Sequence, residues 1–92
     1  MSIDIGFNSD INVSRRKFHL QTSYLEETNR VQVAWFEGGR MVQKREFAVQ
    51  SWDNHAELQK QISDYHESVK SDIELLFMII DRVRSSKHPA SI

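Results

Sequence analysis

The feature that most constrains this chain is an uninterrupted helical pattern in its second half. Large side chains recur there in steps of three and four, with a mean of about 3.6, the period of an amphipathic α-helix. The residues are Leu58, Ile62, Tyr65, Val69, Ile73, Leu76, Ile80 and Val83. Asn54 and Glu57 match a capping box at the start, no glycine or proline interrupts the pattern, and Pro89 ends it. The sequence therefore predicts one long helix over residues 53–85.

The first half of the chain has the pattern of a β-sheet. Runs rich in β-branched and aromatic residues are separated by polar loops, and the glycines at 38 and 39 indicate a hairpin turn. We expect residues 15–50 to form an antiparallel meander, with residues 1–14 as a lead-in or a first strand. The predicted fold is one α+β domain over residues 1–92: three or four strands, then the helix, with residues 86–92 as a mobile tail.

The predicted helix is too long for the predicted sheet. A helix over residues 53–85 is roughly 50 Å long, whereas a strand of about eight residues covers roughly 26 Å. The helix therefore extends past its sheet with its more apolar half, which we expect to self-associate in a homodimer or higher oligomer. The predicted interface is Val69, Ile73, Leu76, Phe77, Ile80 and Val83. Two alternatives remain: the helix breaks near 71–72 and folds back onto the sheet, or it docks on another protein.

Composition and motifs limit the functional classes. Twelve basic and thirteen acidic residues leave a net charge of −1, and there is no cysteine to form a disulfide or a thiolate metal site. No nucleotide-binding or nucleophile motif is present, and the four histidines lack metal-ligand spacing. The N-terminal residues carry acids where a signal peptide has bases. We therefore expect a cytoplasmic protein that is not an enzyme and has no cofactor, no metal and no contact with a membrane.

The sheet offers a candidate surface for a protein partner. Trp35 and Phe36 are adjacent on a strand, so they point to opposite faces, and one of them must lie away from the helix. The predicted partner-binding residues are Arg16, His19, Gln21, Trp35, Phe36, Arg40 and Arg45. The near-zero net charge favours a protein over a nucleic acid. The alternative is a nucleic-acid-binding module whose basic edge would comprise Arg15, Arg16, Lys17, Arg40, Lys44 and Arg45.

Several of these residues also carry a resemblance. The segment Phe18-His19-x-Gln21-Thr22, the turn Gly38-Gly39-Arg40 and His66 on the helix resemble a small uncharacterised bacterial domain over residues 15–70. The resemblance implies a bacterial cytosolic protein and no activity. A polar pocket would follow if His19 and Gln21 stood near His66. Otherwise His19 and Gln21 are sheet-surface residues that bond across strands, and His66 lies at a surface or an interface.

Overall fold

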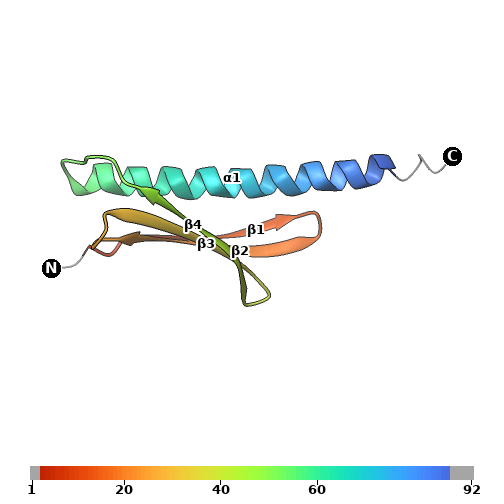
Figure 1. Cartoon of the computed structure of the whole chain (residues 1–92), viewed down its shortest axis with the longest axis horizontal. Helices are drawn as coiled ribbons and strands as arrows, with labels where there is room; N and C mark the ends of the chain where they lie inside the picture. The colour runs from red at the N-terminus through yellow and green to blue at the C-terminus, as the bar shows by residue number, and fades with distance from the viewer. Residues whose placement is uncertain (1–2, 88–92) are drawn as a thin grey trace.

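The computed structural model describes residues 3–87, with side chains described as far as residue 84, and shows a four-stranded sheet beneath one long helix (Figure 1). The elements are β1 (Gly6–Val13), β2 (Arg16–Leu25), β3 (Arg30–Glu37), β4 (Arg40–Ala48) and α1 (His55–Lys87). The strands pair in chain order and all pairs are antiparallel. The predicted α+β meander followed by one helix is therefore confirmed, with the lead-in forming β1.

Two tight turns set the length of the hairpins. Gly38 and Gly39 join β3 to β4 with positive φ angles of 59° and 81°, which suit a two-residue hairpin and cost glycine little. Ser14 and Arg15 join β1 to β2 with φ angles of 51° and 65°, although neither is glycine. The Ser14 hydroxyl donates a 3.0 Å hydrogen bond to the carbonyl of Phe77, which fixes this turn against α1.

The core lies between α1 and one face of the sheet, in two apolar clusters. The cluster under the start of α1 contains Ile5, Tyr24, Val31, Val49, Leu58 and Ile62. The cluster under the middle of α1 contains Ile11, Phe18, Leu20, Val33, Trp35, Val69 and Ile73. Between the two clusters along the helix stands His66, whose ring bonds to Ser9 and Thr22 on the sheet. We call these three residues the polar layer.

The helix is capped as predicted and does not break. The Asn54 side chain accepts a 3.0 Å hydrogen bond from the amide of Glu57, and the Glu57 carboxylate accepts one from the amide of Asp53. The helix runs without interruption through 71–72 to Lys87, so the alternative in which it folds back is wrong. Residues 86 and 87 belong to the helix, and the rest of the predicted tail, 88–92, lies outside the described residues.

The helix outruns its sheet, as the length mismatch predicts. It packs across β1, β2 and β3, and the β1–β2 turn meets it at Phe77. Just beyond Phe77 the β1–β2 turn still lies beside Ile80, and the helix then extends past the sheet, which makes the molecule elongated, 64 Å in its longest dimension (Figure 1). On the β4 side Tyr65 stacks on Phe47 at 4.7 Å, and its hydroxyl donates a 3.1 Å hydrogen bond to the carbonyl of Ala48. The C-terminal part of α1 therefore presents a surface that the sheet does not cover.

Candidate functional site

The part of α1 that passes the end of the sheet exposes a concentration of large apolar side chains. Relative exposures are 57% for Leu75, 53% for Leu76, 55% for Met78, 51% for Ile79 and 45% for Val83. A single exposed leucine or isoleucine is ordinary, but a contiguous apolar patch on a small protein marks an interaction site. This helix end is the first candidate site.

The predicted self-association residues fall into two groups. Val69 and Ile73 are only 2% and 4% exposed because the sheet reaches as far as Phe77, so these two belong to the chain's own core and are removed from the predicted interface. Phe77 is half-buried, with its ring 5.0 Å from that of Phe18. Ile80 is also half-buried, whereas Leu76 and Val83 are exposed.

The predicted interface also omitted three of the most exposed apolar residues. Leu75, Met78 and Ile79 lie outside the 3.6-residue stripe, because that stripe is the one that faces the sheet. The signal that locates them is the run of consecutive apolar residues at 75–80, because a helix that buries only one face has apolar residues on that face alone.

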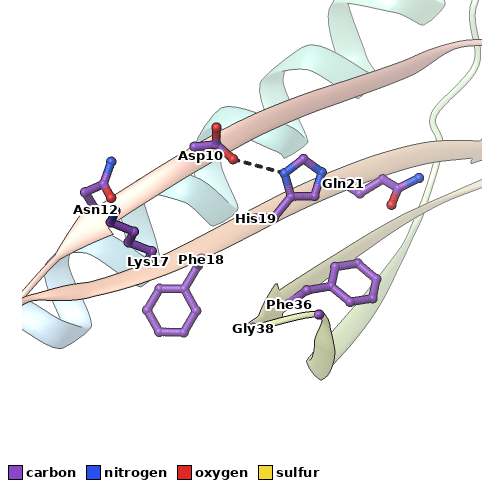
Figure 2. Close-up of a pocket in the computed structure, with 9 residues that line it drawn as sticks. Asp10, Asn12, Lys17, Phe18, His19, Gln21, Phe36 and Gly38 are labelled. Carbon is purple, nitrogen blue, oxygen red and sulfur yellow. Dashed lines mark hydrogen bonds and ion pairs between the residues drawn. The ribbon is translucent and has the colours of Figure 1, made fainter.

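The second candidate site is a hollow of about 630 Å³ on the open face of the sheet, the face away from α1. Figure 2 shows Asp10, His19, Gln21 and Phe36 around it, drawn from three adjacent strands. The ring of His19 is held at both nitrogens: Nδ1 lies 3.1 Å from Asp10 Oδ1 and Nε2 lies 3.2 Å from Asn8 Oδ1. His19 is therefore a sheet-surface residue that bonds across strands.

The structure decides which of the two adjacent aromatics faces outward. Trp35 is 5% exposed and belongs to the core under α1, so it is removed from the predicted partner surface. Phe36 is half-buried on the open face and pairs directly with His19 on the neighbouring strand. The open face thus brings together His19, Gln21 and Phe36 among the predicted partner-binding residues.

The basic side chains do not form one stripe. Arg16 makes two hydrogen bonds of 2.6 and 2.8 Å to Glu37 and lies over the rings of Phe18 and Phe77, on the side of the sheet that carries α1. These hydrogen bonds hold the pKa of the Glu37 carboxyl below its ordinary value. Arg45 lies over the ring of Trp35 on that same side.

The remaining cations lie elsewhere. Lys17 lines the hollow on the open face, Lys44 pairs with Ala34 on β3, and Arg40 is exposed beside the β3–β4 turn. Two of the arginines already have carboxylate partners, since Arg45 lies 3.9 Å from Asp72 and Arg16 binds Glu37. Splitting and neutralising the basic residues in this way gives little support to a nucleic-acid surface.

His66 is the residue that the sequence interpretation placed wrongly. It is 3% exposed, with Nδ1 2.6 Å from the Thr22 hydroxyl and Nε2 2.7 Å from the Ser9 hydroxyl. Burial lowers the pKa of its imidazole below the ordinary value, Glu67 acts in the opposite direction, and Lys70 adds to the lowering. The sheet separates His66 from His19 and Gln21, so the polar pocket that would join the three does not form.

Within residues 3–87, no group of three or more histidine and acidic side chains is placed to hold a metal ion. The same part of the chain contains no helix that is both long and apolar enough to cross a membrane. Comparison of the chain with models of known families, with curated proteins and with solved structures gives no match. The resemblance to a bacterial domain accordingly stays a prediction.

Proposed function

We propose that this chain is a small homo-oligomeric protein-interaction domain, an adaptor or regulatory subunit of the cytoplasm. It self-associates through the C-terminal half of α1 and presents the open face of its sheet to a protein partner. The observation that carries the proposal is the helix end, where Leu75, Leu76, Met78 and Ile79 are each more than half exposed as the helix passes the end of its own sheet.

The energy available at the helix end is large for so small a domain. Fully burying a leucine, isoleucine or methionine contributes about 1.5–3 kcal/mol, so covering the exposed halves of four such side chains contributes about 4 kcal/mol per chain. The total stability of a domain is only about 5–15 kcal/mol. The pair therefore gains about 8 kcal/mol, and association costs at least about 4 kcal/mol of lost translational and rotational freedom, so we expect a dissociation constant that is roughly millimolar.

The open sheet face suits a protein partner better than a polyanion. Phe36 pairs across strands with Met41, which is 53% exposed, and both residue types are enriched in protein interfaces. The charges around them are mixed, with Asp10 and Lys17 on the same hollow. The absence of cysteine from the sequence agrees with a reducing compartment.

The test is the molar mass in solution, measured by size exclusion with light scattering over a range of concentrations. The chain should give a dimer or higher oligomer that dissociates on dilution, and Ile79→Glu should give a folded monomer. Gln59→Glu is the matched control, because it adds the same charge to an exposed position in the half of α1 that covers the sheet. A wild-type chain that stays monomeric at high concentration would refute the proposal, as would an Ile79→Glu oligomer unchanged in mass.

A further inference from the structure

The exposed side chains of the helix end form one line along α1. Leu76, Ile79 and Val83 follow each other in steps of three and four, the spacing of a seam between two helices, and Leu75 lies beside them. We call these four residues the helix seam. Seven and fourteen residues before Ile79 come Asp72 and Tyr65, which continue the same line toward the start of the helix.

The contacts of that line show which way the seam faces. Tyr65 stacks on Phe47, and Asp72 lies 3.9 Å from Arg45; both partners belong to β4. The seam therefore runs along the side of α1 that faces β4, roughly a quarter-turn away from the side that is buried on β1, β2 and β3. A second helix can lie beside α1 along the exposed part of this line, from Leu75 to Val83, and it meets the Arg45 side chain where the line reaches Asp72.

Charge favours one orientation of the second helix, although the Asp72 carboxylate already lies 3.9 Å from Arg45 of its own chain. Asp72 stands at the sheet end of the line and Arg82 borders it near the other end. In a parallel pair, Asp72 would face Asp72 of the partner subunit, which is unfavourable. In an antiparallel pair, the acidic end of each seam lies against the basic end of the other.

The position of the β1–β2 turn selects the same arrangement. The sheet supports α1 as far as Phe77, where the Ser14 hydroxyl bonds to the helix. When Leu76 of one copy packs against Ile79 of the other, the two-fold axis falls between 77 and 78. The β1–β2 turn lies beside Phe77 and Ile80, close to this axis, so the two sheets meet near it and extend from it in opposite directions.

We propose that two copies pair antiparallel through their helix seams, with Leu76 against Ile79 of the partner subunit, to form a rod with a sheet at each end. This inference rests on the proposed function and specifies its partner as a second copy in one orientation. The two open-face hollows then lie at opposite ends of the rod. The dimer is a double-ended connector that can hold two partner molecules apart.

Disulfide trapping tests the orientation, since the chain has no cysteine of its own. In the antiparallel register Asp72 lies opposite Val83 of the partner subunit, whereas in a parallel pair the two positions are about 16 Å apart along the axis. Asp72→Cys and Val83→Cys, one carrying a size tag, are refolded together and oxidised. Mixed cross-linked dimers should dominate, and Gln59→Cys, far from the seam, should give almost none. Dominance of unmixed Val83→Cys dimers, which keep Asp72, would overturn the proposal.

Small-angle X-ray scattering of the wild-type dimer provides the second readout. The antiparallel rod has a maximum dimension of about 100 Å, because each chain is 64 Å long and the helices overlap by roughly 28 Å, the length of residues 68–87. A parallel dimer is about as long as one chain. A dimeric mass with a dimension near 64 Å would therefore overturn the antiparallel arrangement and leave the proposed function standing. A monomeric mass at every concentration would overturn both.

Discussion

The polar layer allows a quantitative test of what holds α1 on the sheet. Replacing His66 by leucine removes two short hydrogen bonds, of 2.6 Å to Thr22 and 2.7 Å to Ser9. Both hydroxyls stay in the core without a partner, and a buried polar group without one costs about 1–3 kcal/mol. The half-buried Ser9 can recover part of this from water, so we expect His66→Leu to lower the free energy of unfolding by about 3 kcal/mol.

The assay is urea unfolding followed by circular dichroism, with a companion variant that removes the unpaired hydroxyls. Adding Thr22→Val and Ser9→Ala to His66→Leu makes the layer apolar and should restore most of the lost stability, because replacing all partners together avoids orphaned groups. His19→Leu is the control, since its partners Asp10 and Asn8 are exposed. Refutation would come from His66→Leu costing no more than His19→Leu, or from a triple variant no more stable than the single one.

Three further predictions follow from the same contacts. Because burial lowers the pKa of His66 in the folded state, the unfolded chain takes up the proton first as the pH falls. The free energy of unfolding should therefore be highest above the pKa of the unfolded histidine, about 6.5, and should fall as the pH drops below it. Thermal melts across that range should show a smaller fall in His66→Leu. Ile73→Val should lower the free energy of unfolding of the monomer, measured in urea, by about 1 kcal/mol, whereas Ile79→Val should leave it almost unchanged. Equal decreases in the two variants would contradict the assignment of Ile73 to the core and Ile79 to the surface. Asn54→Ala should cost about 1 kcal/mol through loss of the helix cap, with Asn12→Ala, on the exposed face of β1, as the silent control in the same assay.

Local patterns were sufficient to predict the order and type of the elements. The 3.6-residue period with Asn54 and Glu57 at its start predicts α1 and its cap, and the two glycines predict the β3–β4 turn. The sequence does not decide between a lead-in and a strand for β1, because Asn8, Ser9 and Asp10 have the composition of a turn. Ser9 occupies a core-facing position that only its bond to His66 explains, and that bond joins residues far apart in the sequence.

The sequence does contain a signal for the burial of His66. His66 follows Ile62 by four residues and precedes Val69 by three, so it belongs to the buried stripe as much as Tyr65 does. Thr22, its partner, stands between Leu20 and Tyr24 on the apolar face of β2. A buried polar residue on each of two facing elements is a pattern that predicts a hydrogen bond between them.

The extent of the helix end was beyond what the sequence pattern could define. Val69 and Ile73 look identical to Leu76 in periodicity, and only the reach of the sheet separates them. That reach depends on how the β1–β2 hairpin lies under α1 and where its turn stops, at Phe77. No local preference encodes such a crossing angle.

The polar layer also has a consequence for the length of the free helix. Apolar clusters alone would tolerate a helix that slides along the sheet, since Ile62, Val69 and Ile73 are similar in shape and chemistry. A shift of one turn, about 5.4 Å, would bring Ile62 or Lys70 against the hydroxyls of Ser9 and Thr22 and leave both unpaired. His66 therefore fixes the register of α1 along the sheet. The number of residues that project beyond the sheet is set by a single histidine more than ten residues away from them.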